Sequence, residues 1–167
     1  SDGSALFTGG VDVNGVNYVV RYNLSTDYDI STVVTNGTLN GNSSWQGAIS
    51  LNALHSTHGF GTTPGRIDDI AFSSDGKSMY IIDDTTDVIY SYKLLSAWDL
   101  SNTSNVIPNG IFKIKGFATN GISLHLNSAQ DFAVISNLND ALYQFTVDHD
   151  TIAIDSSAVK TKGSLTV

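Results

Sequence analysis

Three aspartates between two short apolar runs are the strongest candidates for metal chemistry in this sequence. Asp83, Asp84 and Asp87 fall within five residues, and Ca²⁺ is a hard cation that takes several oxygen ligands. The same residues also favour a solvated hairpin turn, because aspartate accepts hydrogen bonds from the backbone of its own turn. The equivalent turn further along the chain, residues 136–140, has fewer carboxylates. Ca²⁺ is therefore the only cofactor that the sequence leaves open, with a plain turn as the alternative.

A glycine-rich segment between residues 45 and 66 predicts a binding loop, because long irregular insertions often carry function. Its two histidines, three residues apart, could share a metal on a helix, but the surrounding glycines disfavour a helix and no third ligand is evident. Aromatic rings beside Asn, Ser and Thr suit a glycan, whereas local packing of those rings is the alternative. The candidate ligand-binding residues are Trp45, His55, His58, Phe60 and Arg66.

The sequence predicts no catalytic residues. It has no cysteine, which excludes disulfides, thiolate zinc sites and cysteine nucleophiles. Neither a G-x-S-x-G motif nor a glycine-rich phosphate loop occurs. Asp68 and Asp69 are adjacent at a predicted strand, so their side chains should point to opposite faces. We therefore expect them to have structural roles and not to form a carboxylate pair.

Composition limits the range of partners. The formal net charge is −8, and an acidic surface repels nucleic acid and anionic lipid. No apolar run approaches the roughly 18 residues that a membrane-spanning helix needs. Only 14% of residues are charged, which is below the roughly 25% of an average soluble domain. We expect neither nucleic-acid binding nor membrane insertion.

An internal repeat of short β-branched and aromatic runs, separated by tight turns, sets the predicted fold. Residues 87–92 align with residues 140–145 at an offset of 53, and residues 23–31 align with 93–101 at an offset of 70. The pattern predicts one all-β domain over residues 1–167, built like a β-propeller from about three four-stranded blades. The units are about 1–66, 67–120 and 121–167, and the excess length of the first lies between Thr32 and Arg66. A β-sandwich or jelly roll is the alternative.

Some individual elements can also be predicted. The fourth strand of each blade is expected near residues 33–34, 111–114 and 158–161, and a single turn of helix near 49–55. Three blades are fewer than the 4–8 of a closed propeller. We therefore expect a larger or oligomeric ring, completed by self-association or by neighbouring repeats. Residues 163–167 are similar to 121–126, so they could supply the inner strand that the first unit lacks.

The middle unit resembles a propeller-like repeat of phage structural proteins and of large surface proteins of marine bacteria. The resemblance rests on Asp75–Ile82, Asp87–Leu94 and Leu95–Ser101, is partial in the first unit and is poor in the third. It implies an extracellular or virion-surface setting, with Trp98 packed between blades and Asp99 capping a turn. It carries no catalytic residues.

These observations lead to three functional readings. The main prediction is a non-enzymatic structural or adhesive repeat domain that mediates protein or glycan contacts. A carbohydrate-binding propeller lectin is the first alternative. The second is a fragment of a propeller hydrolase or lyase, which carboxylates gathered at channel-facing strand ends would favour.

Overall fold

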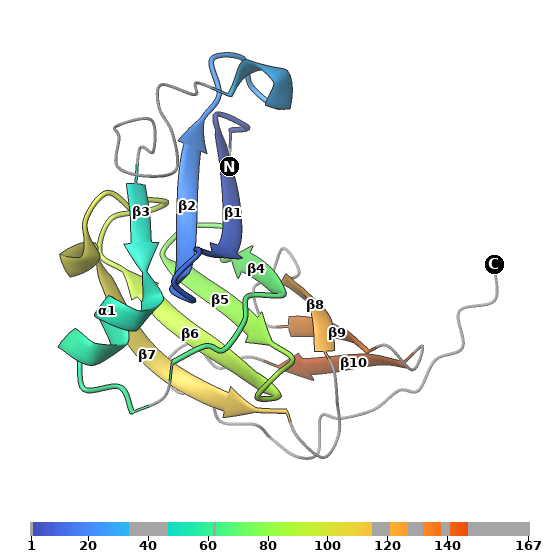
Figure 1. Ribbon diagram of the computed structural model, residues 1–167. Helices are drawn as coiled ribbons and strands as arrows, with labels where there is room; N and C mark the ends of the chain where they lie inside the picture. The colour runs from blue at the N-terminus through green and yellow to red at the C-terminus, as the bar shows by residue number, and fades with distance from the viewer. Residues whose placement is uncertain are drawn as a thin grey trace.

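Three antiparallel β-sheets lie side by side in the protein (Figure 1, a computed structural model). The structure describes residues 2–33, 47–61, 63–114, 121–126, 132–137 and 141–146. No helix among these residues is long and apolar enough to cross a membrane. The architecture is all-β and propeller-like, as predicted.

The strands follow the chain from one sheet to the next. The first sheet has the order β1-β2-β3, the middle sheet β4-β5-β6-β7 and the third sheet β10-β9-β8. Their bounds are β1 Ala5–Val11, β2 Asn17–Asn23, β3 Gly47–Ser50, β4 Asp69–Phe72, β5 Ser78–Asp83, β6 Val88–Leu94, β7 Val106–Lys113, β8 Gly121–Leu126, β9 Phe132–Asn137 and β10 Ala141–Thr146. The helical segments are α1 Leu51–Thr57 and two short 3₁₀ turns, η1 Ile30–Thr32 and η2 Thr103–Asn105.

The middle sheet is deeply buried. Its strands β5 and β6 are apolar on both faces and are buried along nearly their whole length, because the first sheet and α1 cover one side and β8 packs against the other. The core cluster joins the two sheets and the helix, with members such as Val19, Ile49, Leu54, Met79 and Tyr90. Burial of this apolar area is the main stabilising contribution to such a fold.

The repeat seen in the sequence is also seen in the backbone hydrogen bonds of the first and middle sheets. Tyr28 N donates to Gly3 O, and Trp98 N donates to Gly76 O, both at 2.9 Å. Gly3 and Gly76 have φ values of +82° and +68°, which glycine adopts without steric cost. A Cβ atom at either glycine would collide with the aromatic ring of its partner. The same glycine–aromatic contact is therefore present once in the first sheet and once in the middle sheet.

Two predictions for the middle sheet are confirmed. The Trp98 ring lies between the first and middle sheets, with centroids 6.0 Å from Phe7 and 5.3 Å from Phe72. Asp99 caps the turn after β6, since its Oδ1 accepts a hydrogen bond from Ser101 N at 2.8 Å.

The outer strand of the first sheet differs from the prediction. Val33 forms one isolated bridge with Leu24, but the ladder with β2 is made by Gly47–Ser50. The ladder predicted near residues 33–34 is therefore made by a later segment, and residues 34–46 lie outside the described residues. The corresponding strand β7 begins at Val106, earlier than predicted, and pairs with β6 up to Lys113 with one register shift. The strand predicted at 158–161 lies outside the described residues.

The predicted helical turn and the number of strands per blade also need adjustment. The helix begins at Leu51, two residues after the predicted start, because Ile49 and Ser50 complete β3. The Ser50 side chain then caps the helix by accepting from Ala53 N at 3.2 Å. Among the described residues only the middle sheet has four strands, and the first and third have three each.

Candidate carboxylate site

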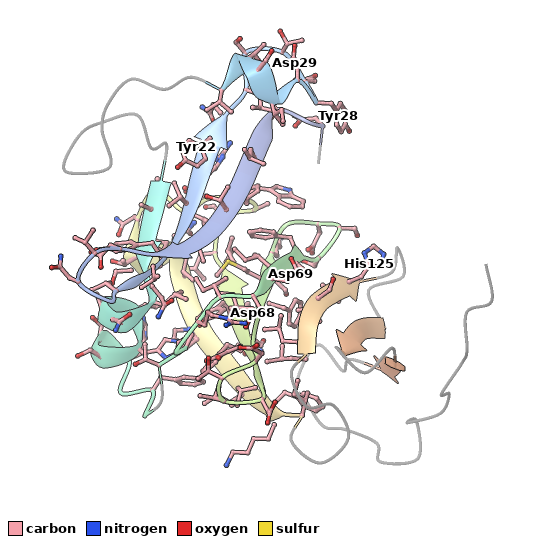
Figure 2. The ribbon with its side chains drawn as sticks, turned by 45° about the vertical axis from the view of Figure 1, so that its right-hand side comes forward. Tyr22, Tyr28, Asp29, Asp68, Asp69 and His125 are labelled. Atoms are coloured by element: carbon pink, nitrogen blue, oxygen red, sulfur yellow. The ribbon has the colours of Figure 1, made fainter. Side chains whose placement is uncertain are left out.

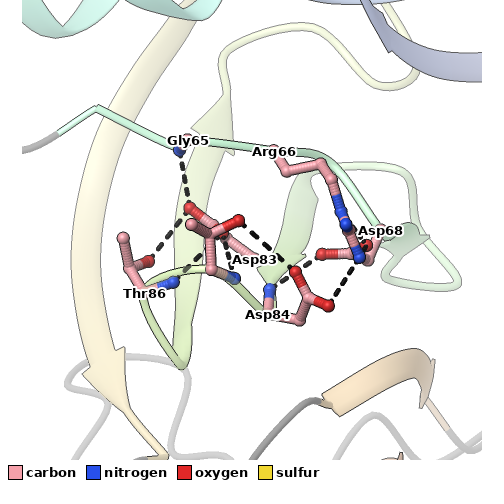
Figure 3. A network of polar contacts seen from close by, with 7 residues as sticks. Gly65, Arg66, Asp68, Asp83, Asp84 and Thr86 are labelled. Carbon is pink, nitrogen blue, oxygen red and sulfur yellow. Dashed lines mark hydrogen bonds and ion pairs between the residues drawn. The ribbon is translucent and has the colours of Figure 1, made fainter.

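Three carboxylates meet at one end of the middle sheet, where the connection from α1 enters β4 and where β5 ends. Asp68, Asp83 and Asp84 place one oxygen each within 4.8 Å of one another, as Figure 3 shows. The strand register explains this meeting, because β4 and β5 are antiparallel with Asp69 opposite Ile82. The residue before β4 therefore lies beside the end of β5.

Asp83 has a structural role in the cluster. It is fully buried, and its Oδ2 accepts hydrogen bonds from Gly65 N at 2.6 Å and from Thr86 Oγ1 at 2.9 Å. Its Oδ1 accepts from Thr85 N at 2.9 Å and from Thr86 N at 3.3 Å. A buried carboxylate needs such donors to offset its desolvation. Asp83 thus ties the β5–β6 turn to the connection that precedes β4.

Arg66, which the sequence analysis selected as a ligand-binding residue, lies between the other two carboxylates. Its Nε donates to Asp68 Oδ1 and its Nη2 to Asp84 Oδ2, both at 2.5 Å. Asp68 Oδ2 also accepts from Asp84 N at 2.8 Å. The other Asp84 oxygen, Oδ1, is 3.4 Å from Thr85 Oγ1, which is a long contact for such a pair. Oδ1 is therefore the oxygen of the cluster that is held most weakly.

The surroundings of Asp84 favour its protonated form. Burial first and the charge of Asp68 second raise the pKa of Asp84 above the ordinary aspartate value, while Arg66 opposes the shift. The carboxylates of Asp68 and Asp84 in turn raise the pKa of the guanidinium, through the hydrogen bond to Asp68 first. Asp84 is consequently a stronger base than an exposed aspartate.

Asp69 points away from this cluster and joins the middle sheet to the third. Its Oδ2 accepts from Ser123 Oγ at 3.0 Å and from Leu124 N at 2.9 Å. The prediction that Asp68 and Asp69 lie on opposite faces is confirmed, and Asp69 has the expected structural role. Sequence reasoning missed that Asp68 lies beside Asp84, a carboxylate in the turn that follows β5. The available signal was Arg66, a cation placed two residues before Asp68.

The predicted metal triad is brought together only in part. Asp83 and Asp84 belong to the cluster, but its third member is Asp68 and not Asp87, which adopts a positive φ of 52° in the β5–β6 turn. Ca²⁺ takes six to eight oxygen ligands, whereas the Asp83 oxygens already accept protein hydrogen bonds and Arg66 already forms ion pairs with Asp68 and Asp84. These residues fit an ion pair better than a calcium site.

The predicted binding loop is not a single surface. His55 is buried, and its Nε2 lies 2.9 Å from the Tyr92 hydroxyl. Phe60 packs edge-on against the His55 ring at 5.2 Å and belongs to the margin of the core. His58 is exposed at the end of α1, so the two histidines do not share an environment for a metal. Trp45 lies outside the described residues.

An open pocket adjoins the site on the side of Thr86. Its volume is about 640 Å³, and its floor is apolar, formed by side chains of β6 and β7. Thr86 lines the pocket and also donates a hydrogen bond to Asp83, so the pocket adjoins the cluster. The lining residues are Thr63, Thr86, Val88, Tyr90, Ile111 and Lys113.

Solved structures share this architecture at low sequence identity. A protein from Lactobacillus plantarum matches with a TM-score of 0.53 and 17% identity, over 90% of this chain and 40% of that one. A candidate 6-phosphogluconolactonase from Bacteroides uniformis matches with a TM-score of 0.51 and 16% identity, over 95% and 42%. Another from Bacteroides fragilis matches with a TM-score of 0.50 and 12% identity, over 91% and 37%. The chain spans about two fifths of the length of these structures.

These likenesses concern the fold alone, since no protein-family model and no curated protein matches the chain. They nevertheless contradict the main functional prediction. We expected a non-enzymatic structural or adhesive domain, but the proteins with this architecture include candidate lactonases. The comparison favours the alternative of a propeller hydrolase fragment.

Proposed function

We propose that this chain is part of a propeller-type hydrolase that opens a cyclic ester, with Asp84 as the general base. The observation that carries the proposal is the Asp68–Arg66–Asp84 arrangement at the end of the middle sheet. It supplies a carboxylate with a raised pKa whose second oxygen is weakly held. The candidate lactonases of similar architecture support the same class of reaction.

In this proposal the reaction begins at Asp84 Oδ1. A water molecule donates a hydrogen bond to Oδ1, and as its oxygen attacks the ester carbonyl carbon its proton passes to the carboxylate. A tetrahedral oxyanion forms. When it collapses, the ring C–O bond breaks, and the leaving alkoxide takes the proton back from Asp84. The product is a hydroxy acid, and Asp84 is again a carboxylate.

Arg66 and Asp68 act in this scheme as positioning residues. Arg66 Nη2 donates to Asp84 Oδ2, which leaves Oδ1 with only the long contact to Thr85, and Asp68 Oδ2 accepts from the backbone N–H of Asp84. The charge of Asp68 also contributes to the raised pKa of Asp84. The pocket that begins at Thr86 provides space for a bound molecule at the same end of the sheet.

The test is a continuous assay of acid release from δ-gluconolactone and from unsubstituted δ-valerolactone, corrected for spontaneous hydrolysis. We expect the Asp84→Asn variant to lose about 100- to 10,000-fold in kcat, the range for removal of a general base. The matched control is Asp27→Asn, which neutralises an exposed aspartate outside the cluster. Failure of the wild-type protein on both lactones, or full activity of Asp84→Asn, would overturn the proposal.

The pH profile separates the base from a merely structural aspartate. Activity should rise as pH increases through the raised pKa of Asp84, because only the carboxylate accepts a proton. In Asp68→Asn the inflection should move to lower pH, since the charge of Asp68 is one cause of the upward shift. A profile that is unchanged in Asp68→Asn would contradict the assignment of Asp84.

A further inference from the structure

The floor of the pocket beside the carboxylate cluster follows from the strand register of the middle sheet. Tyr90 of β6 lies opposite Ile111 of β7. Two residues closer to the β5–β6 turn, Val88 lies opposite Lys113 in the same way. Alternate residues of a strand point to the same face, so these four side chains share one face of the sheet. They line a pocket of about 640 Å³, a volume typical of small-molecule sites.

The layer that covers this face is closed at one end and open at the other. At Tyr92 the cover is α1, whose His55 Nε2 lies 2.9 Å from the Tyr92 hydroxyl. Toward the end of the sheet the cover thins, so that Ile111 is only partly buried and Lys113 is exposed. Thr63, in the connection that follows α1, lines the pocket beside them. The pocket therefore occupies the end of the face that α1 leaves open.

The two sides of the pocket carry opposite charge. Asp83 of β5 also lies opposite Val88, so Asp83, Val88 and Lys113 form one row across three strands. The carboxylate cluster, to which Asp68 in Figure 2 belongs, is thus on one side of Val88 and Lys113 is on the other. Both ion pairs in the part of the chain that the structure describes are made by Arg66. The ammonium group of Lys113 is therefore available to an anion that enters the pocket.

The hydroxyl group of Thr86 adds a preference for a hydrogen-bond donor. Thr86 Oγ1 donates its proton to Asp83 Oδ2 at 2.9 Å. Thr86 also lines the pocket, and toward it this oxygen can only accept a hydrogen bond. An alcohol group of a ligand satisfies this oxygen, whereas a carboxylate placed there would be repelled by the cluster.

We propose that the pocket binds hydroxy acids with an apolar chain, and the corresponding cyclic esters as substrates. The inference rests on the proposed function, since opening a cyclic ester produces a hydroxy acid. The apolar chain lies on the floor of Val88, Tyr90 and Ile111, and the carboxylate that forms on ring opening pairs with Lys113. The new alcohol donates to Thr86. A sugar acid fits less well, because its hydroxyl groups lose their hydrogen bonds to water on an apolar floor.

Isothermal titration calorimetry with 5-hydroxydecanoate and with gluconate tests the binding. We expect one 5-hydroxydecanoate to bind per chain, and gluconate to bind about 100-fold more weakly. Lys113→Met keeps an apolar stem but removes the charge, and should raise the dissociation constant for 5-hydroxydecanoate about tenfold. The matched control is Lys93→Met, at an exposed residue on the opposite face of β6, which should leave that constant unchanged. Circular dichroism confirms that each variant is folded.

A second variant tests the apolar floor without a change in charge. Ile111→Thr keeps a branched side chain but places a hydroxyl group on the floor, and should weaken 5-hydroxydecanoate binding about fivefold. Gluconate binding should change less. The proposal would be overturned if the folded wild-type chain did not bind 5-hydroxydecanoate or bound gluconate equally well. It would also be overturned if Lys113→Met left the affinity unchanged.

Hydrolysis of δ-decalactone, compared with δ-gluconolactone, separates this inference from the proposed function. We expect kcat/KM to be about tenfold higher for δ-decalactone or more, because its alkyl chain lies on the apolar floor. If neither lactone is hydrolysed but 5-hydroxydecanoate binds through Lys113, the pocket assignment holds and the role of Asp84 falls. If both are hydrolysed with equal kcat/KM and Asp84→Asn is inactive, the role of Asp84 holds and the pocket assignment falls.

Discussion

In the first sheet the turn after β2 leaves Ile30 in solvent, whereas in the middle sheet the same turn buries Leu100 completely. The backbone hydrogen bonds of the two turns agree closely, including the bond from the aromatic residue to its glycine. Turn geometry therefore depends on local residues, and burial depends on which sheet is the neighbour. The comparison teaches that equivalent sequence can make unequal contributions to stability.

The two sheets also differ where β1 and β5 end. Asp83 pairs with Val88 across the middle sheet, and the corresponding position in the first sheet is Gly10, opposite Tyr18. The carboxylate cluster is thus an addition to the middle repeat. The first sheet closes the same end with a simple turn, in which the side chain of Asp12 accepts from two backbone N–H groups.

Removal of Asp83 should have the largest effect on stability. Asp83→Ala leaves four donor hydrogens without their acceptor in a buried site, so we expect a loss of about 4 kcal/mol in the free energy of unfolding. Asp12→Ala, in the exposed turn of the first sheet, should cost much less. Urea-induced unfolding followed by circular dichroism measures both. Equal losses would break the comparison, because they would show that burial adds nothing to the role of Asp83.

The aromatic residues of the two turns should rank next. Trp98→Ala removes a ring packed against both Phe7 and Phe72, and we expect a loss of about 3 kcal/mol. Tyr28→Ala removes an exposed ring and should cost less than about 1 kcal/mol. The measurement is urea-induced unfolding of both variants followed by circular dichroism. A larger loss for Tyr28→Ala would mean that its ring is packed within the protein.

The two turn glycines sharpen the same comparison. Gly3→Ala and Gly76→Ala both force alanine into a positive φ, which costs about 1 kcal/mol. At Gly76 the new Cβ also meets Trp98, which neighbouring rings hold in place. We therefore expect a loss of about 2 kcal/mol more for Gly76→Ala. Thermal unfolding of the two variants compares them directly, and equal midpoints would show that the Trp98 ring can move aside.

Some parts of the fold could be predicted from the sequence and others could not. Strand positions in the middle sheet were predictable because Asp75 and Gly76 mark a hairpin turn between apolar runs. The position of the outer strand in the first sheet was not predictable, since the short apolar pair at residues 33–34 suggested the ladder that Gly47–Ser50 makes. Sequence spacing also separates Asp68 from Asp84 by 16 residues. Only the antiparallel register of β4 and β5 brings their carboxylates together.

The burial of His55 could not be predicted for a different reason. His55 is a polar residue in a glycine-rich stretch, which favours an exposed role when only composition is considered. The fold instead places it on the inward face of α1, where the Tyr92 hydroxyl satisfies its ring. Burial raises the pKa of Tyr92 well above its ordinary value, so the phenol stays neutral as part of the core. Such a polar pair cannot be read from either residue alone.

The smallest expected effect concerns acid stability, where the two sheets should behave alike. Hydrogen bonds from the Ser31 side chain and backbone lower the pKa of Asp29, and those from Ser101 lower the pKa of Asp99. A lowered pKa in the folded state gives stability that is present above the ordinary aspartate pKa of about 3.9 and is lost as pH falls through the lowered value.

Asp29→Asn and Asp99→Asn should therefore each weaken the dependence of unfolding free energy on pH by a similar amount between about pH 5 and pH 2. The two effects should be similar because each pKa is lowered mainly by hydrogen bonds within the turn itself, although the surroundings of the two turns differ. Asp99 also feels the charge of Arg21 as its weakest influence, so its effect should be slightly the larger. Urea titrations across this pH range measure both slopes. If only Asp99→Asn changed the slope, acid stability would depend on the contact between sheets and not on the turn itself.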